Sequence, residues 1–530
     1  LLDVIEFINN GNMVEVRDYS FISFSEYTDD KRYERFKTTI HSVSGTTEGG
    51  SASKYISVLN KADDNVKSYT TSYKLRADEG KEEETEKYVY DLSVYENSFR
   101  GFGALYSKTY SDFRANFDGR SCCVKIKMDR NWDPDVAITG MFNSLIYDVK
   151  EANNTVDPDK IAPLVIQNFN IVDSKFQNLL NKEDLSTIDE TNKRQGAVCG
   201  AATGAVAGEV QGKWDIKDIT FKRTEAATST VSNSELLFAA LNDEEIDRLT
   251  CGVRGYMNVG GLIGRINVTE IDTEYGIKKV HKASNSIGIK RCFVQGFEDT
   301  NRVNIIGGTN AFAVGGLVGS VGANVNSYQY DDKSDEKRYF YFGEVLFEDC
   351  TVKNANVLAK NSGFLGGFAG TVGYNAGIHC RTVGRVIVEH DDKNAEFNII
   401  DQVKILSTVY ESRNDALDKY SAGGVFGQIE VLAYKPLAPA SDNKVYRNSE
   451  ISSEAEFSNI QDVTVNNVVI CNQSDNTYTN TDGNEAYTLN GRTGGIGGLI
   501  GYLNCRKMVI ENVQVKGATI GFNDEESQND

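Results

Sequence analysis

The sequence predicts an all-β protein in which short strands stack as a β-solenoid. Two motifs, one rich in glycine and one of alternating apolar residues, interleave between residues 166 and 515. Repeats spaced in this way are typical of solenoids and related arrays. The composition agrees, because 26 Tyr and 25 Phe suit sheets, while 5 Pro and 48 Gly leave the turns to Gly, Asn and Asp.

The first motif is G-G-h-h-G, where h is an apolar residue. A glycine inside a strand or helix costs roughly 0.5–1 kcal/mol relative to alanine, so its repetition indicates a demand of the backbone. We interpret each copy as a corner of a stacked coil, where the bend needs positive φ and successive corners pack closely. A phosphate-binding loop would need a lysine or a following helix, and the copies have neither. The five copies are Gly260–Gly264, Gly315–Gly319, Gly366–Gly370, Gly423–Gly427 and Gly497–Gly501.

The second motif is a hexamer of the form apolar-x-x-apolar-x-apolar. Alternating residues of this kind, rich in β-branched side chains, predict strands with one buried face. If the strands stack in register, the first apolar residues of all copies form a single inward ladder. The copies begin at Ile166, Ile216, Ile289, Phe347, Ile400, Ile460 and Ile510.

Two of the nine cysteines occupy the middle apolar position of the hexamer. Cys292 and Cys350 stand there, and a buried free thiol behaves as a small hydrophobe. We therefore expect both to be free members of the core ladder, rather than disulfide partners or nucleophiles. The equivalent positions in the other copies are Phe169, Ile219, Val403, Val463 and Val513.

These motifs resemble the GLUG-type repeat of bacterial surface and adhesin-like proteins, in which a glycine-rich core precedes an I-x-N-C/V-x-V strand. The stretch FRANFDGRSCCVKIKM at Phe113–Met128 resembles the entry segment of such domains, and ITGMFNSL at Ile138–Leu145 takes the place of a first glycine motif. The sequence departs from the pattern at Asn143 and Ala205, where glycine is usual. The resemblance implies a right-handed parallel β-helix on an extracellular protein, and it implies no chemistry.

Three regions are expected along the chain. Residues 1–89 lack both motifs, and they predict an N-terminal cap, because an uncovered strand edge would invite pairing with other chains. Residues 90–522 form the β-solenoid, a right-handed parallel β-helix with long inserted loops and hairpins. The acidic segment 523–530 predicts a flexible tail.

The charge of the chain limits its partners. Its 76 acidic and 56 basic residues give a formal net charge of −20, which repels nucleic acid and anionic membrane surfaces. No apolar run approaches the ~18 residues of a transmembrane helix. We expect no nucleic-acid partner and no membrane insertion by this segment, which looks like part of a larger processed protein.

No pattern in the sequence indicates a catalytic residue, a cofactor or a metal. Glycoside hydrolysis needs two carboxylates at a set separation, and a solenoid would place them on successive turns. The acidic stretches at Tyr330–Arg338, Glu389–Asn394 and Asn480–Glu485 do not repeat in that way and read as inserted loops. The four histidines are scattered, at His41, His281, His379 and His390.

One insertion predicts a hairpin arm. In Asn326–Val345, two tyrosines alternate before a polar tip and two alternate after it. Aromatic rings on such an arm suit recognition of sugars or proteins, although they could instead lie over the coil as a lid. We expect replacement of the whole arm to leave folding nearly intact. The candidate binding residues are Tyr328, Tyr330, Tyr339 and Tyr341.

The expected function is that of a non-enzymatic protein of the cell surface or the extracellular space. It would serve adhesion or act as a rigid stalk, contacting protein or glycan ligands on another surface, or copies of itself. The alternative is a carbohydrate-active β-helix enzyme, a polysaccharide lyase or a glycoside hydrolase. A groove lined by carboxylates from adjacent turns would distinguish the two.

Overall fold

The structure is a computed structural model of the 530-residue chain. The residues that it describes are 13–16, 40–43, 72–74, 89–93, 101, 113, 116–131, 138–147, 162–179, 201–224, 251–267, 269–273, 286–298, 301–308, 312–322, 338–360, 363–373, 380–391, 397–409, 420–431, 458–474, 493–505 and 507–520.

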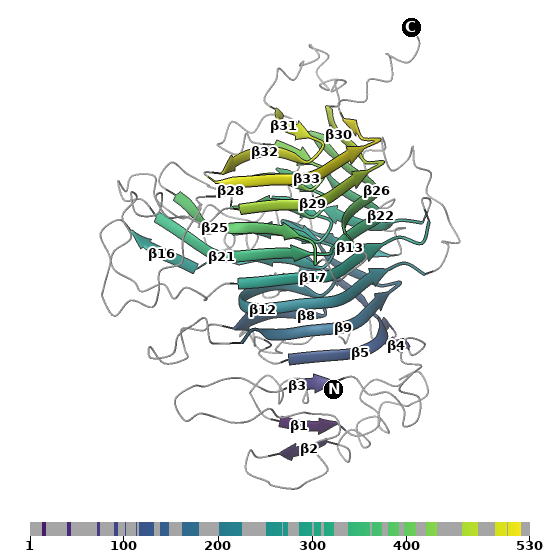
Figure 1. Ribbon diagram of the computed structural model, residues 1–530. Helices are drawn as coiled ribbons and strands as arrows, with labels where there is room; N and C mark the ends of the chain where they lie inside the picture. The colour runs from purple at the N-terminus through teal and green to yellow at the C-terminus, as the bar shows by residue number, and fades with distance from the viewer. Residues whose placement is uncertain are drawn as a thin grey trace, which may run out of the picture.

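These residues form an all-β structure whose strands pair mainly in parallel. Four rows of strands stack in chain order from bottom to top in Figure 1. The pairs β1–β2 and β16–β21 are antiparallel, whereas the pairs within the four rows are parallel. The described part of the chain contains no helix long and apolar enough to cross a membrane.

The front row, named for its position in Figure 1, holds the hexamers. It consists of β5 (Asn116–Lys125), β9 (Leu164–Val172), β12 (Ala207–Lys222), β17 (Ser286–Gln295), β21 (Arg338–Glu348), β25 (Cys380–Glu389), β29 (Ser458–Asn466) and β33 (Met508–Lys516). The second row follows after a bend and consists of β6 (Lys127–Asn131), β10 (Lys175–Leu179), β13 (Gly252–Gly255), β18 (Val303–Gly307), β22 (Thr351–Lys360), β26 (Asn398–Val409), β30 (Val469–Ser474) and β34 (Thr519–Ile520).

The glycine motifs connect the two remaining rows. The third row is a separate seven-stranded sheet of β7 (Ile138–Thr139), β11 (Ala202–Gly204), β14 (Asn258–Gly260), β19 (Ala313–Gly315), β23 (Phe364–Gly366), β27 (Tyr420–Gly423) and β31 (Thr493–Gly497). The fourth row consists of β8 (Phe142–Tyr147), the first part of β12, β15 (Ile263–Ile266), β20 (Val318–Val321), β24 (Ala369–Val372), β28 (Phe426–Val431) and β32 (Ile500–Cys505).

Five further segments complete the described strands. They are β1 (Met13–Val16), β2 (Ile40–Val43), β3 (Ser72–Lys74), β4 (Val89–Asp91) and β16 (Thr269–Thr273). Because β3 and β4 both pair in parallel with β5, the lower edge of the first front strand is partly covered. We call one passage through the four rows a rung.

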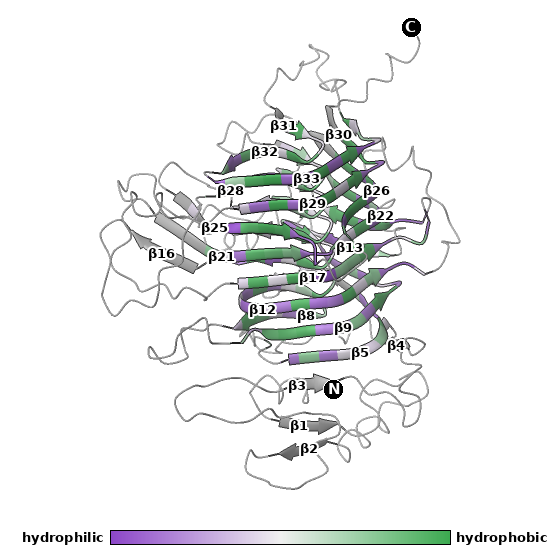
Figure 2. Cartoon of the chain, in the orientation of Figure 1, coloured by the Kyte–Doolittle hydropathy of each residue, from purple (hydrophilic) through white to green (hydrophobic). Residues whose placement is uncertain are grey.

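The inward ladder predicted from the hexamers is largely confirmed. In the front row, Ile166 pairs with Ile216, Ile216 with Ile289, and Ile289 with Phe347, and all four side chains are fully buried. Green and purple alternate along these strands in Figure 2, as expected for one buried and one solvated face. The stacked apolar rows supply most of the core.

Ile400 and Val403 lie elsewhere than the sequence predicts. The partner of Phe347 is Val388 of β25, whereas Ile400 pairs with Val352, at the end of the preceding hexamer. Val403 pairs with Ala355, beyond the next bend. The prediction fails here because the sequence of β25 lacks the full hexamer. The hexamer pattern therefore skips β25, and Ile400 of the following strand takes its place in the predicted ladder.

The bends between the front and second rows are made by residues other than glycine. In seven of the eight described rungs the equivalent residue has a φ of 48° to 65°, the left-handed region that Asn and Asp tolerate best among residues with a side chain; the exception is the rung of β25. A side chain can therefore remain at the bend and pair with its neighbour one rung away. The residues are Ser121, Asn168, Asp218, Arg291, Asp349, Asp462 and Asn512.

The repeated glycines serve close packing, and the predicted positive φ is wrong for them. None of the ten first and last motif glycines is among the described residues with positive φ. A Cβ on Gly315 would lie 1.9 Å from the carbonyl oxygen of Val318, and one on Gly316 would lie 1.9 Å from that of Gly367 in the next rung. Any larger residue would thus push the backbones of the third and fourth rows apart.

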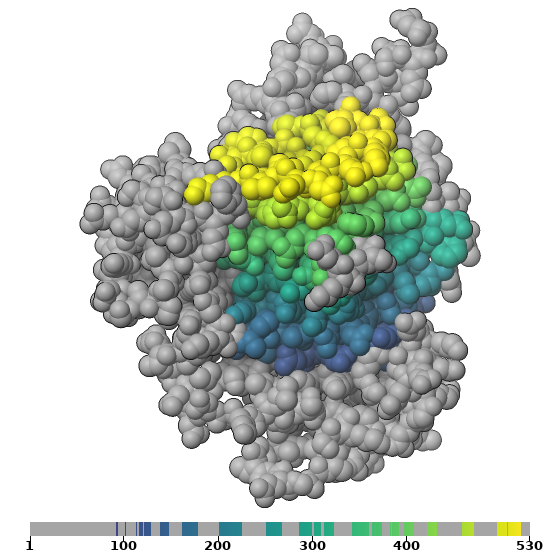
Figure 3. All heavy atoms as spheres, in the orientation of Figure 1, coloured from purple at the N-terminus to yellow at the C-terminus, as the bar shows by residue number. Residues whose placement is uncertain are grey.

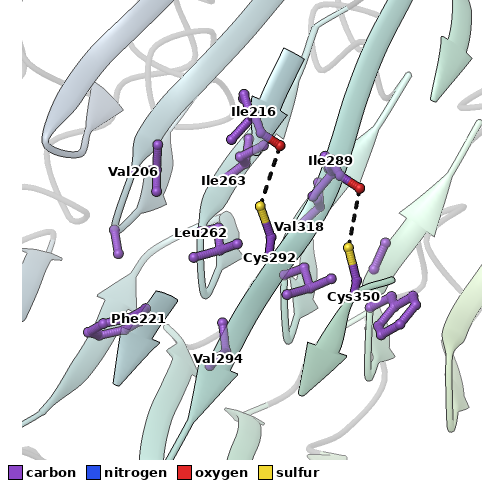
Figure 4. Close-up of a cluster of buried hydrophobic side chains, with 14 of the residues drawn as sticks. Val206, Ile216, Phe221, Leu262, Ile263, Ile289, Cys292, Val294, Val318 and Cys350 are labelled. Atoms are coloured by element: carbon purple, nitrogen blue, oxygen red, sulfur yellow. Dashed lines mark hydrogen bonds between the residues drawn. The ribbon is translucent and has the colours of Figure 1, made fainter. Parts of the chain in front are cut away.

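Cys292 and Cys350 are free and fully buried, as predicted. Their thiols point to backbone carbonyls one rung away: Sγ of Cys292 lies 3.4 Å from the oxygen of Ile216, and Sγ of Cys350 lies 3.2 Å from that of Ile289 (Figure 4). Burial raises the pKa of the Cys350 thiol to about 12 and also raises that of Cys292. Both thiols are therefore protonated and unreactive at neutral pH.

A buried asparagine repairs the one front-row bend that an insertion interrupts. β25 ends at Glu389 and β26 begins at Asn398, which occupies the middle ladder position opposite Val463. The Oδ1 atom of Asn398 accepts the N–H of Cys350 at 3.0 Å, and its Nδ2 atom donates to the carbonyl of Glu389 at 2.7 Å. The side chain thus replaces two backbone partners that the insertion removes.

The last rung exposes the ends of the ladders. Ile510 and Val515 are 46% and 42% exposed, whereas Ile460 and Val465, their partners one rung below, are fully buried. In Figure 3 this rung forms the yellow band at the top of the described residues. The exposure follows from position, because no described rung lies above β33.

The buried asparagine gives a test of the fold. Replacing Asn398 with Val, the residue found at the equivalent position in β29, should lower the free energy of unfolding by about 1–3 kcal/mol for each backbone group left unsatisfied. Asn466→Val is the control, because Asn466 makes only a 3.3 Å hydrogen bond to Asp401 on the outer side. Urea denaturation measures both, and equal effects of the two variants would contradict the assignment.

The thiols give a second test. A thiol reagent added to the native protein should leave Cys292 and Cys350 unmodified, since both are buried and protonated. After denaturation without reductant, peptide mapping should find both modified. Detection of either residue in a disulfide would contradict the ladder position.

Candidate functional site

The tyrosine arm is only partly within the described residues. Tyr328 and Tyr330 lie outside them, so the predicted hairpin remains a prediction. Tyr339 and Tyr341 belong to β21, whose first half pairs antiparallel with β16 and parallel with β25. In Figure 1 these three segments project to the left of the stack.

The segment Asn326–Val345 is not a surface excursion along its whole length, which is the premise for expecting that its replacement leaves folding intact. β21 continues from the projecting segment into the front row, where Phe342 and Val345 are fully buried. A Cβ on Gly384 of β25 would lie 2.5 Å from the ring of Phe342, so the ring is closely enclosed. The replaceable part of the insertion is thus limited to residues before β21.

A second surface, which the sequence did not predict, lies on the outer side of the front row. Lys217, Lys290, Glu348 and Glu389 occupy the same slot on four successive rungs. We call these four residues the front charge ladder. Glu348 and Glu389 are therefore two carboxylates on adjacent strands, whose backbones lie about 4.8 Å apart.

Arg291 and Arg385 form ion pairs within and beside the front charge ladder. Arg291, at a bend, forms two hydrogen bonds with the carboxylate of Asp218, at 2.6 and 3.1 Å, and lies 3.4 Å from Glu348. Arg385 of β25 donates from Nε to the carboxylate of Glu344 at 2.7 Å. The ion pairs connect four successive rungs, from β12 to β25, and their partial burial makes them stronger than fully solvated pairs.

Glu389 has the most perturbed carboxyl group of this surface. Burial, followed by the charges of Glu348 and Glu344, raises its pKa above the usual value of 4.5, while Lys290 and Arg385 oppose the shift. A carboxyl group with a raised pKa close to a second carboxyl group is the arrangement that general acid catalysis uses. The same arrangement also arises in structural charge networks.

His390 adds an aromatic and titratable group at the end of β25. Its Nδ1 lies 2.6 Å from Oδ1 of Asp349, and the two side chains are 7% and 0% exposed. The ring stacks on Phe397 with a centroid distance of 4.2 Å, and Phe397 is 45% exposed. An exposed aromatic ring therefore stacks on the histidine that follows Glu389 in the chain.

These side chains offer acid–base chemistry and hydrogen bonding more readily than metal binding. Among the described residues, no group of three or more His, Cys, Asp or Glu is arranged to hold a metal ion. The expectation that acidic residues do not coincide on successive rungs is wrong for Glu389, which ends a core strand rather than opening a loop. The alternation of Val386 and Val388 in GRVIVE is the signal that could have identified the strand.

Comparisons with known proteins add little. No family model matches the sequence. No curated protein matches it either. A crystal structure described as a "putative immunoglobulin A1 protease" from Bacteroides ovatus aligns with 82% of this chain and 79% of its own, at 12% sequence identity and a TM-score of 0.34. A likeness at that level assigns neither fold nor activity to this chain.

The raised pKa of Glu389 predicts a pH-dependent effect of Glu389→Gln. A carboxyl group whose pKa is raised by folding favours the folded state at low pH and opposes it once the pH rises through the folded pKa. The variant should therefore be more stable than the parent at pH 7, and the gain should vanish at about pH 4, below the ordinary Glu pKa. Melting temperatures of both proteins at the two pH values measure this. A gain of equal size at both would contradict the assignment.

Proposed function

We propose that this chain is a non-enzymatic, extracellular or cell-surface repeat protein, adhesin-like or serving as a rigid stalk, with the GLUG-type repeat as its building unit. The observation that carries the proposal is the in-register stacking of rungs, each tied to the next through core ladders and outer ion pairs. A stack of this kind is a stiff scaffold from which insertions project, and recognition generally resides on such loops.

Within this proposal the fold is a right-handed parallel β-helix spanning residues 90–522, with residues 1–89 as a cap and 523–530 as a flexible tail. The support for the hand is general. Connections between parallel strands of one sheet are right-handed in about 98% of cases, because right-twisted strands favour that crossover. The strands of all four rows pair in parallel, so this general preference applies to the connections between them.

The partners proposed are proteins or glycans on another surface, or copies of the same chain. The low sequence pI of about 4.8 and the net charge of −20 disfavour nucleic acid and anionic membranes. The arm that holds Tyr339 and Tyr341 is the proposed contact surface, because β16 and the first halves of β21 and β25 project from the stack. No cofactor is proposed.

A second candidate function is favoured by one observation. Glu348 and Glu389 are in register on adjacent strands, and glycoside hydrolases use paired carboxylates. The exposed ring of Phe397 stacks on His390, which follows Glu389 in the chain, and aromatic rings suit sugar recognition. In this reading Glu389 would be the general acid. The ion pair of Glu348 with Arg291 weighs against it, because that carboxylate already has a structural partner.

The binding proposal is tested with arrays of glycans and extracellular proteins, using three proteins. They are the parent chain, a variant with residues 326–337 replaced by a Gly/Ser linker, and the double variant Tyr339→Ser, Tyr341→Ser. We expect the parent to bind a ligand and each variant to bind it more weakly, while the linker variant keeps the parent's melting temperature because β21 is retained. Undiminished binding by both variants would exclude the arm.

The enzyme alternative is tested by reducing-sugar release from a panel of acidic polysaccharides. The non-enzymatic proposal predicts no release above a heat-denatured control. Release that is abolished by Glu389→Gln and by Glu348→Gln would contradict it and assign catalysis to the front charge ladder.

A further inference from the structure

The outer side of the fourth row carries polar side chains that are almost completely buried. The side chains alternate with core residues such as Ile429, so they face away from the core. In-register pairing places them in one slot on five successive rungs. They are Glu209, Arg265, Ser320, Thr371 and Gln428, which are between 0% and 9% exposed.

At the lower end of this slot the buried charge is paired. The carboxylate of Glu209 bonds to the guanidinium of Arg265 one rung above and accepts a further hydrogen bond from Asn267 at 2.9 Å. Such pairing is what buried charges require, because an isolated carboxylate away from water is strongly unfavourable. Here the guanidinium of Arg265 neutralises the carboxylate of Glu209.

At the upper end a carboxylate in the adjacent slot has only neutral partners. Glu430, two residues after Gln428 on the same face of β28, is 6% exposed. Its two oxygens accept hydrogen bonds from Nε2 of Gln428 at 2.8 Å and from Nδ2 of Asn504 at 3.3 Å. No Lys, Arg or His among the described residues forms an ion pair with it.

Two acceptor atoms beside Glu430 are buried without any hydrogen-bond partner. They are Oε1 of Gln428 and Oγ1 of Thr371, its in-register neighbour in β24. The orientation of the Gln428 amide is fixed, because a carboxylate can only accept and Nε2 must face it, which leaves Oε1 free. In the preceding rung the equivalent Ser320 is satisfied by Oδ1 of Asn258 at 2.8 Å.

We propose that Glu430, Gln428 and Thr371 form a binding site for a hard cation, with Ca²⁺ as the best match. The site combines a carboxylate and an amide oxygen, which are ligands that calcium prefers, with a hydroxyl as a further oxygen donor, and water could complete the coordination. Cation binding would neutralise the buried charge and give both orphan acceptors a partner. Glu430 bonds to Asn504, an exposed residue of the last rung, so the site lies near the solvent-exposed end of the fourth row.

The proposed cation would also strengthen the weakest end of the stack. Thr371, Gln428 and Asn504 belong to β24, β28 and β32, three successive strands of the fourth row that end at the last described rung. Bound Ca²⁺ would link these strands where the ladders lose their upper partners. This inference does not depend on the proposed adhesive function, because it concerns stability and metal binding alone.

The test compares melting temperatures of the whole chain in EDTA and in Ca²⁺. The parent should melt higher in Ca²⁺, whereas Glu430→Gln should melt at the same temperature in both conditions. In EDTA, Glu430→Gln should be at least as stable as the parent, because it removes an unpaired buried charge. Asp401→Asn is the control, because Asp401 is paired with Lys353 at 3.3 Å on another row, and it should retain the full response to Ca²⁺.

A binding measurement makes the test independent of stability. Tyr502 pairs in register with Gln428, so a Tb³⁺ ion at the site should show tyrosine-sensitised luminescence that Ca²⁺ displaces. Glu430→Gln should abolish this signal and Thr371→Val should weaken it. Luminescence and a Ca²⁺ response that are unchanged in Glu430→Gln, or absent from the parent chain, would overturn the proposal.

Discussion

The constraint on which this structure depends is parallel backbone pairing in register. A strand in the middle of the stack must find partners for its N–H and C=O groups on the strands directly above and below. Every rung must therefore follow nearly the same backbone path as its neighbours. Bends recur at the same position, and the same slot on successive rungs meets the same environment, which is apolar inside and polar outside.

The consequences of this constraint differ between the two kinds of corner. Between the front and second rows the bend needs a left-handed residue, and Asn or Asp supplies it while its side chain remains available to the next rung. Arg291 is an exception to the preference for Asn or Asp at this bend. Its left-handed backbone conformation is unfavourable, and its side chain forms ion pairs with Asp218 and Glu348. Between the third and fourth rows the need is space, and glycine is required because backbones approach too closely for a Cβ.

The sequence predicts the stacking well because apolar residues recur at the same positions of the hexamer in successive rungs. The start of the hexamer is correct in six of the seven copies. The error at Ile400 arises because β25 keeps only part of the motif and because an insertion separates it from β26. For the repeated glycines, close packing is predicted correctly and positive φ is not. The spacing of glycines indicates that the backbone demands glycine at these positions, but it does not distinguish a positive φ from crowding.

The candidate sites are much less predictable from the sequence. The outer slots that bring Glu348 beside Glu389, or Thr371 beside Gln428, join residues 41 and 57 positions apart. Such contacts can be predicted only when the strand register is known. Assigning one strand to the wrong rung, as happened with β25 and β26, is enough to miss them. Glu209 is paired with Arg265, whereas Glu430 has no cationic partner among the described residues. This difference depends on which residues lie nearby in the fold, and the local sequence does not indicate it.

The most direct test of in-register stacking is a distance measurement between spin labels at Gln167 and Gln461, introduced by a chemistry that does not use cysteine. The two residues occupy the same outer slot five rungs apart, so their backbones should be about 24 Å apart. Moving the second label to Glu511, the partner of Gln461, should lengthen the distance by one rung, about 4.8 Å. A broad distribution, or no lengthening on that move, would contradict the account.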